Sequence, residues 1–299
     1  MKTIRCLESL AHQDYPNYEI IVVDNASTDS SVEEIRAAFP DVKMIIADEN
    51  LGYAGGNELA LNSVLEIDDG TGLFWILNND TVVLQDTLVA LIEAYHQYGQ
   101  ALYGSVTVDG GLHKEDWRVN TRIWENNRSR ELRSVPYKSR YVSTTPRVVE
   151  AVGGSSLLVP LAVVKQYGFI DPSFFMYCED TDYCFKLRYM GIQNIEVPES
   201  VVIHAGGASH KSNSRSTLQP VITYYRARNK IVLQRKHFGT GAYIKAVATQ
   251  SIFALGWLVL TFRRGIVGPR SACFTLLGIR DAIRGRMGKV YAPEDYLKK

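Results

Sequence analysis

Strand-like and helix-like segments alternate along the first hundred residues, and this alternation limits the possible folds more than any other feature of the chain. Short apolar runs typical of buried strands lie at 18–25, 42–50 and 72–80. Segments with helical spacing or helix-start residues lie around them, at 1–12, 27–39, 52–67 and 87–99. This order predicts an α/β fold with a mostly parallel, Rossmann-like sheet and helices on both faces.

The remainder of the chain has weaker signals. Residues 109–148 are polar with little strand character, so we expect a long excursion from the fold there. Strand-like runs return at 152–160 and 195–207. From Gln219 onward the chain is basic and apolar with helical spacing, which predicts a helical tail.

Charge is distributed unevenly over the chain, although the formal net charge is only +1. Residues 215–299 contain 16 Lys/Arg and 3 Asp/Glu, a net +13, whereas 1–214 contain 17 and 29, a net −12. We therefore expect a catalytic domain over 1–214 and a basic helical tail over 215–299. The tail should contact something anionic, either a membrane surface or nucleic acid.

A run of 17 uncharged residues at 246–262 favours the membrane. At about 1.5 Å per residue a helix of this length spans about 25 Å, short of the ~30 Å hydrocarbon core of a bilayer. We expect an interfacial or re-entrant helix on a membrane, with attraction to anionic lipid and no nucleic acid partner. A core helix buried against the catalytic domain is the alternative.

Cysteine usage and the N-terminal sequence indicate the compartment. The four cysteines are scattered and show no metal-type spacing, which predicts a reducing environment. The N-terminus has no charged-then-apolar signal pattern. We expect a cytoplasmic catalytic part that is peripheral on the inner face of the cell membrane.

Acidic residues follow the strand-like runs. Asp24 closes the first run, Asp29 follows in the next loop, and Asp80 closes the third in "FWILNND". In open α/β sheets ligands bind beyond the carboxyl ends of the strands. There, carboxylates accept hydrogen bonds from a nucleotide or hold a divalent cation. A turn-forming role is the alternative for Asp24 or Asp29 singly, but three acids ending neighbouring strands favour a ligand site.

A second acidic cluster follows an aromatic run, at Glu179, Asp180 and Asp182. Like charges crowded beside apolar side chains can raise the pKa of one carboxylate and make it a usable base. Acids that merely complement a helix N-terminus are the alternative. His204 ends an apolar strand, and the pattern alone favours a structural role for it. The glycines of "ENLGYAGGNE" do not match the dinucleotide fingerprint and indicate a tight turn into a helix.

Five motifs, taken in order, resemble those of the family-2 glycosyltransferases of the GT-A fold, in particular the rhamnosyltransferase-like branch. They are "YEIIVVDNASTDSS", "NLGYAGGNE", "LNNDTVV", "FFMYCEDTDYCFKLR" and "HAGGAS", between about Thr3 and Ser209. The resemblance implies transfer of a sugar from a nucleotide-sugar donor to an acceptor hydroxyl, with inversion at the anomeric carbon and no covalent intermediate.

The resemblance also implies roles for individual residues. Asp24 would contact the donor's base and Asp29 its ribose, while Gly153 and Gly154 would form a wall beside donor and acceptor. "NND" stands where the family has its metal motif, so Asp80 is expected to bind Mg²⁺ or Mn²⁺ and Asn79 the donor, with Asn78 a weaker metal candidate. His204 matches a metal-ligand position of some members, and Asp180 matches the general base.

The expected substrates also follow from the resemblance: dTDP-rhamnose as donor, with a UDP-sugar next, and a polyprenyl-linked glycan of cell-surface polysaccharide synthesis as acceptor. Two other functions remain open, a catalytically degenerate member that binds sugar nucleotides or membrane, and a sugar nucleotidyltransferase. The latter needs a Gly-rich phosphate loop with a basic residue after the first strand, which the sequence does not show. Family members begin with a central apolar strand, and we expect it ahead of Met1.

Overall fold

The computed structural model describes residues 2–66, 70–109, 118–125, 128–136, 143–204, 213–259 and 267–297, with the backbone alone over 118–136. These residues form two compact units. Unit 1 comprises Met1–Ile46, Asn57–Phe169 and Tyr183–Ser209, and unit 2 comprises Ala47–Gly56, Ile170–Asp182 and His210–Lys299. Each unit is described by itself below.

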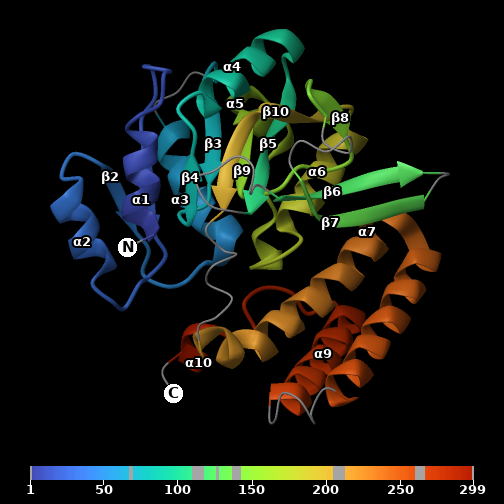
Figure 1. Cartoon of the computed structure of the whole chain (residues 1–299). Coiled ribbons are helices and arrows are strands. Elements are labelled where there is room, and N and C mark those ends of the chain that lie inside the picture. Colours follow the sequence, from blue (N-terminus) through green and yellow to red (C-terminus); the bar gives the residue numbers. More distant parts are fainter. Residues whose placement is uncertain are drawn as a thin grey trace. The chain divides into compact units, whose positions relative to one another are not determined.

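The first hundred residues have the predicted alternation of helices and strands (Figure 1). In chain order they form α1 (Lys2–Leu10), β1 (Ile21–Asp24), α2 (Ser31–Ala38), β2 (Lys43–Ile46), α3 (Gly52–Leu65), β3 (Leu73–Leu77), β4 (Thr81–Val83) and α4 (Thr87–Tyr98). Helix α1 shows why the pattern works, because its buried residues Thr3, Cys6, Leu7 and Leu10 recur at helical spacing on one face.

The middle of the chain contributes β5 (Ala101–Asp109), β6 (Arg118–Glu125), β7 (Arg128–Pro136), β8 (Arg147–Val149), β9 (Ser156–Pro160), α5 (Leu161–Tyr167), the 3₁₀ turn η2 (Pro172–Phe174), α6 (Glu179–Tyr189) and β10 (Gln193–His204). The polar stretch 109–148, expected to be an irregular excursion, instead contains β6 and β7, which pair antiparallel, and β8, which pairs with β10. The sequence over 118–136 is rich in Arg and low in apolar residues, so the strand pattern did not reveal β6 and β7.

Strand pairing in unit 1 differs from the mostly parallel sheet that we expected. Strands β1 and β2 form a parallel pair, and a second sheet has the order β3-β9-β5-β10-β4. Within that sheet β5 and β10 are parallel, whereas β3–β9, β5–β9 and β10–β4 are antiparallel. The first hundred residues predict parallel strands, but β9 and β10 come from later in the chain and enter this sheet beside them. Among the described residues β1 pairs with β2 alone and β3 with β9 alone.

The core of unit 1 lies on both sides of these strands. One cluster joins α4 to β5, β9 and β10 through Leu91, Tyr103, Leu158 and Ile195. Another, which includes Cys6, Leu7, Ile35 and Val202, joins α1 and α2 to the strands. Helices therefore stabilise the strands by burying apolar side chains, as an α/β fold requires.

Unit 2 is built on the C-terminal helices α7 (Asn213–Val259), α9 (Val267–Arg284) and α10 (Glu294–Leu297), with α9 packed along α7 (Figure 1). Helix α7 contains a break at Gly239, whose φ of 78° and ψ of −172° are not helical. The predicted helical tail is thus confirmed. Residues 260–262 of the uncharged run lie outside the described residues.

The second half of α7 is apolar on its exposed face. Its buried residues form a narrow stripe that includes Ala246 and Ala254, whereas Ile252 is 68% exposed, Leu255 62% and Val259 72%. By length and composition, the stretch Leu218–Val259 qualifies as a candidate membrane span. Within unit 2 this face of α7 is therefore not covered by the described residues.

Candidate active site

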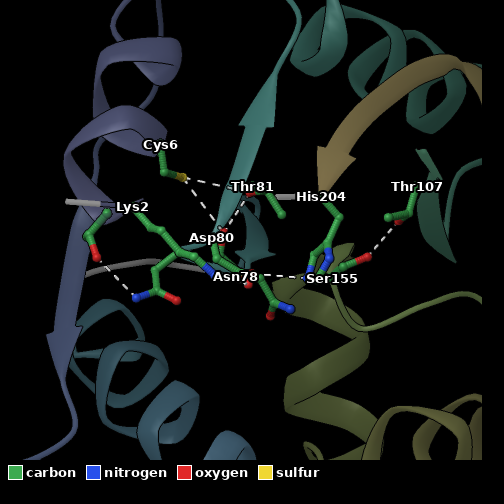
Figure 2. A network of polar contacts seen from close by, with 10 residues as sticks. Lys2, Cys6, Asn78, Asp80, Thr81, Thr107, Ser155 and His204 are labelled. Carbon is green, nitrogen blue, oxygen red and sulfur yellow. Dashed lines mark hydrogen bonds and ion pairs between the residues drawn. The ribbon is translucent and has the colours of Figure 1, made fainter. Parts of the chain in front are cut away.

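Antiparallel pairing of β10 with β4 brings Asp80 and His204 together. His204, the last residue of β10, stands opposite Thr81, the first residue of β4, and Asp80 immediately precedes Thr81. As a result His204 Nε2 lies 3.1 Å from Asp80 Oδ1 (Figure 2). Two residues far apart in the sequence thus face each other at the end of the sheet.

The "NND" turn between β3 and β4 is held from several sides (Figure 2). The Asn78 N–H donates to the Ser155 carbonyl at 3.0 Å, and the Thr81 hydroxyl donates to the Asn78 carbonyl at 2.6 Å. The Asn79 amide donates to the Thr3 hydroxyl at 3.1 Å, which ties the turn to α1. These bonds hold the backbone of Asn78 and the side chain of Asn79, the two residues that precede Asp80.

Asp80 is held as a carboxylate by its neighbours. Its hydrogen bond with His204 lowers the pKa of this carboxyl below its usual value. Partial burial raises the pKa, and the positive charge of Lys2 lowers it. Lys2 Nζ lies 3.5 Å from Asp80 Oδ2 (Figure 2). Asp80 is therefore an ionised carboxylate, with the His204 imidazole beside one oxygen and the Lys2 ammonium beside the other.

The Asp80–His204 pair fits a divalent cation. Two ligand atoms in neighbouring positions around an ion such as Mg²⁺, each at about 2.0–2.1 Å, lie about 3 Å apart, close to the 3.1 Å between these atoms. No group of three or more His, Cys, Asp or Glu side chains in the described part of the chain could hold a metal. One or two protein ligands suffice, however, where substrate phosphates supply the rest.

Asp24 and Asp29 both stabilise local turns in unit 1. Asp24 is buried at the end of β1 and accepts a hydrogen bond from the Ser27 N–H at 2.9 Å. Asp29 accepts from the Ser31 N–H at 3.1 Å and from the Ser31 hydroxyl at the start of α2, and these bonds lower the pKa of the Asp29 carboxyl. The turn-forming role is therefore present, and a donor-binding role stays a prediction.

Gly153 and Gly154 precede β9 in unit 1. A Cβ added to Gly153 would meet only the Ser155 hydroxyl, at 3.8 Å, so packing does not require glycine there. Gly154 is buried. The next residue, Ser155, holds the Asn78 N–H through its carbonyl. The wall role expected for the two glycines stays a prediction.

The second acidic cluster opens α6 and lies in unit 2, where each acid has a different environment. Asp180 is half-buried and accepts from the Thr181 N–H at 2.6 Å and the Thr181 hydroxyl at 3.2 Å. Asp182 is buried, with its oxygens 2.7 Å from His237 Nε2 and 2.8 Å from Lys236 Nζ. Asp182 is therefore paired with a lysine and a histidine of α7.

Glu179 carries the raised pKa that crowding in this cluster predicts. It is 6% exposed, and burial together with the charge of Asp180 raises the pKa of its carboxyl to about 8. Its Oε2 atom is buried without a hydrogen-bond partner among the described residues. Glu179 is thus largely neutral at pH 7. The crowding argument predicted a raised pKa for one carboxylate of the cluster without naming which one, and the role of Asp180 as general base stays a prediction.

Several residues of these sites escaped the sequence reasoning. Lys2 and Thr3 begin a helix that showed only an apolar period, and Ser155 acts through its backbone, which no side-chain pattern reveals. In unit 2 the missed residues are Arg228 and Asn229, both fully buried. No signal in the sequence distinguished them, because the stretch "YYRARNKIVL" also contains Arg226 and Lys230, which are exposed.

Known proteins resemble this chain in sequence. The model of glycosyl transferase family 2 matches residues 3–155, which is about half of the chain. Hexosyltransferase Agl10 of low-salt glycan biosynthesis in Haloferax volcanii is 26% identical over 281 residues, 91% of this chain and 84% of the relative. An N-acetylglucosaminyl-diphospho-decaprenol L-rhamnosyltransferase of Mycobacterium tuberculosis is 25% identical over 70% of this chain and 72% of its own. Rhamnosyltransferase WbbL of Escherichia coli is 26% identical over 70% and 80%.

Solved structures share the fold. The mannosyltransferase PcManGT of Pyrobaculum calidifontis, in complex with GDP-Man and Mn²⁺, has a TM-score of 0.54 at 14% identity and covers 95% of this chain and 84% of its own. GalNAc-T7 with UDP, GalNAc and Mn²⁺ has a TM-score of 0.51 at 16% identity over 76% of this chain and 46% of that longer one. The fold is that of the GT-A glycosyltransferases, and with the family match this chain belongs to glycosyltransferase family 2.

Proposed function

We propose that this protein is an inverting, metal-dependent glycosyltransferase that moves a hexose, with rhamnose favoured, from a nucleotide sugar to a lipid-linked glycan. The observation that carries the proposal is the pairing of Asp80 with His204 at the end of the sheet, at the spacing of two neighbouring cation ligands. Three relatives named as sugar transferases, two of them rhamnosyltransferases, support the choice of sugar.

Donor binding is assigned to unit 1. Asp24 and Asp29 would accept hydrogen bonds from the nucleoside, and Asn79, Gly153 and Gly154 would contact the rest of the donor. Asp80 and His204 would hold Mg²⁺ or Mn²⁺ against the diphosphate. The cation would supply charge neutralisation for the departing nucleoside diphosphate, and the solved relatives with Mn²⁺ support this choice.

Asp180 is the proposed general base. As the acceptor oxygen bonds to the anomeric carbon, its proton passes to the Asp180 carboxylate. The bond from that carbon to the diphosphate breaks at the same time, and its electron pair leaves with the nucleoside diphosphate. A single displacement of this kind inverts the anomeric centre and requires one base.

The exposed apolar face of α7 would hold unit 2 on the cytoplasmic face of the membrane, where a polyprenyl-linked acceptor is found. Ile252, Phe253, Leu255 and Val259 form an apolar surface that water disfavours. Basic residues of the tail would add attraction to anionic lipid. The mycobacterial relative, whose name specifies a decaprenol-linked acceptor, supports this assignment.

Transfer with a panel of nucleotide sugars tests the proposal. The purified full chain is incubated with dTDP-rhamnose, UDP-sugars or GDP-mannose, a polyprenyl-diphosphate-linked N-acetylglucosamine, and Mg²⁺ or Mn²⁺. We expect a glycoside of inverted anomeric configuration, visible by NMR, and loss of turnover with a chelator. Retention of configuration, or nucleoside diphosphate binding without transfer from any donor, contradicts it. Release of pyrophosphate from a sugar phosphate and a nucleoside triphosphate would instead indicate a nucleotidyltransferase.

A further inference from the structure

In unit 2, the chain just before the second acidic cluster follows a strained path. Phe175, Tyr177 and Cys178 have φ values of 66°, 68° and 70°, a region that non-glycine residues rarely adopt. Strained backbone of this kind persists only where surrounding contacts hold it. The loop of residues 174–178, named the cradle loop here, ends directly at Glu179 and Asp180.

Every carbonyl of the cradle loop accepts a hydrogen bond. The Phe175 carbonyl accepts from the Tyr53 N–H at 2.9 Å, and the Cys178 carbonyl accepts from the Asp182 N–H at 2.8 Å within the first turn of α6. The carbonyls of Phe174, Met176 and Tyr177 all accept from side chains of α7. Helix α7 therefore supplies the partners that the loop's own backbone does not.

One side chain, Asn229, serves three of these carbonyls. Its Nδ2 atom lies 3.0 Å from the Phe174 oxygen, 2.8 Å from the Met176 oxygen and 2.8 Å from the Tyr177 oxygen. A ring of acceptors requires a donor at its centre, which fixes the orientation of the amide. Asn229 is fully buried, so water does not compete for these bonds.

Arg228 orients Asn229 and adds a bond of its own. Its Nε atom donates to Asn229 Oδ1 at 2.8 Å, which turns the amide nitrogen toward the loop, and its Nη2 atom donates to the Phe174 carbonyl at 2.9 Å. The guanidinium also donates to the Gly288 carbonyl at 2.7 Å and lies 4.9 Å from the centre of the Tyr225 ring. Both side chains are thus committed to the loop and its support.

We propose that Asn229, oriented by Arg228, is a positioning residue that sets the place of Asp180 by holding the cradle loop in its strained form. The inference rests on the proposed role of Asp180 as general base. Tyr177, whose carbonyl Asn229 holds, lies three residues before Asp180, and Cys178 starts the first turn of α6. Release of the loop lets its backbone relax from positive φ and carries the carboxylate away from its working position.

Three variants separate positioning from simple packing. Asn229→Ala removes the amide N–H donor. Asn229→Asp keeps the shape of the side chain but places a carboxylate oxygen, an acceptor, next to the three carbonyl oxygens. We expect Asn229→Asp to be the more damaging, whereas a volume-filling role predicts the opposite order. Thr223→Val is the matched control, because it removes buried hydrogen bonds of α7, 2.7 Å to the Pro220 carbonyl and 3.3 Å to the Ser271 carbonyl, and Thr223 is not among the hydrogen-bond donors to the cradle loop.

Kinetics and amide hydrogen exchange are measured on the full chain. Asn229→Ala should lower kcat about 10–100-fold, the scale of a small misplacement of a catalytic group, with donor KM and Mn²⁺-dependent nucleoside diphosphate binding unchanged. It should also speed exchange over 176–182, which Thr223→Val should not. The double variant with Asp180→Asn should be no slower than Asp180→Asn alone, because both changes act through one group.

The outcomes separate this inference from the proposed function. The inference is overturned if exchange over 176–182 is unchanged in Asn229→Ala, or if Thr223→Val has the same effects. It is also overturned if the losses in kcat of Asn229→Ala and Asp180→Asn multiply in the double variant. If the wild-type protein transfers no sugar, the proposed function fails, and faster exchange in Asn229→Ala alone would then establish that Asn229 holds the loop without a catalytic purpose. That result would overturn the positioning role.

Discussion

His204 Nε2 lies 3.1 Å from Asp80 Oδ1, although the two residues are far apart in the sequence. Antiparallel pairing of β4 with β10 produces this proximity, since it sets Thr81 opposite His204. The lone histidine, for which the sequence pattern favoured a structural role, therefore faces the strand-end acid. A carboxylate and an imidazole at this spacing are suitable for a divalent cation that also binds phosphate oxygens.

Asp80→Ala should weaken the Mn²⁺-dependent binding of nucleoside diphosphate. Loss of a direct ligand should cost at least the roughly 10–100-fold that loss of a ligand's supporting contact costs. Calorimetric titration with and without Mn²⁺ measures the effect. Asp41→Ala, at an exposed acid of unit 1, is the control for loss of a charge. Equal Mn²⁺-dependent affinity in wild type and Asp80→Ala would show that Asp80 does not bind the metal.

Glu179 should make the protein less stable as pH rises. The native carboxyl keeps its proton up to a pKa of about 8, whereas the unfolded chain releases it near 4.5. Between these pH values the native state binds more protons than the unfolded state. The free energy of unfolding therefore falls as pH rises, by at most about 1.4 kcal/mol for each pH unit.

Denaturant unfolding of wild type and Glu179→Gln from pH 5 to pH 8 checks this sign. The variant should gain stability over wild type steadily across the range, because glutamine is neutral in both states. Glu93→Gln on the exposed face of α4 is the control for loss of an acid. A constant difference between Glu179→Gln and wild type over this range would mean that native Glu179 is ionised.

Particular elements show how far the sequence determines this fold and site. The helices and strands of the first hundred residues follow from apolar periodicity, because burial of one face is a local property of the chain. Strand pairing does not follow, since the partners of β3 and β5 come from β9 and β10, far along the sequence. The positions of Asp80 and Asp180 were recognisable as motifs. Their partners Lys2 and His204, and the loop support from Asn229, depend on tertiary contacts that periodicity does not encode.

Gly52→Ala should destabilise unit 2. Gly52 has a φ of 72°, and an added Cβ would lie 2.1 Å from the carbonyl oxygen of Phe175 in the cradle loop. The backbone conformation alone costs a side chain about 1–2 kcal/mol, and the steric overlap adds to it. Gly241→Ala in α7 is the matched control, because nothing lies within 4 Å of its added Cβ and alanine favours helix by about 0.5–1 kcal/mol. Thermal unfolding should move in opposite directions for the two variants, and a Gly52→Ala protein as stable as wild type would contradict the close contact.

The double change Ile252→Glu and Leu255→Glu should release the protein from membranes. These side chains are 68% and 62% exposed on the apolar face of α7, so a charge there should not disturb the interior. Flotation with vesicles containing anionic phosphatidylglycerol measures binding. Met190→Glu, at an exposed apolar residue directly after α6 in unit 1, is the control and should float like wild type. Equal flotation of the double variant and wild type would exclude this face as the membrane surface.

The central claim, that Asp180 is the base of a glycosyl transfer, is tested most directly by kcat of Asp180→Asn beside that of Glu179→Gln. Asp180→Asn should lose about 10²–10⁴-fold in kcat, the usual contribution of a general base, with Mn²⁺-dependent nucleoside diphosphate affinity unchanged. Glu179→Gln, which replaces a carboxyl that is largely neutral at pH 7 by a neutral side chain, should retain most of its turnover. Near-normal turnover in Asp180→Asn, or the large loss in Glu179→Gln instead, would contradict the assignment.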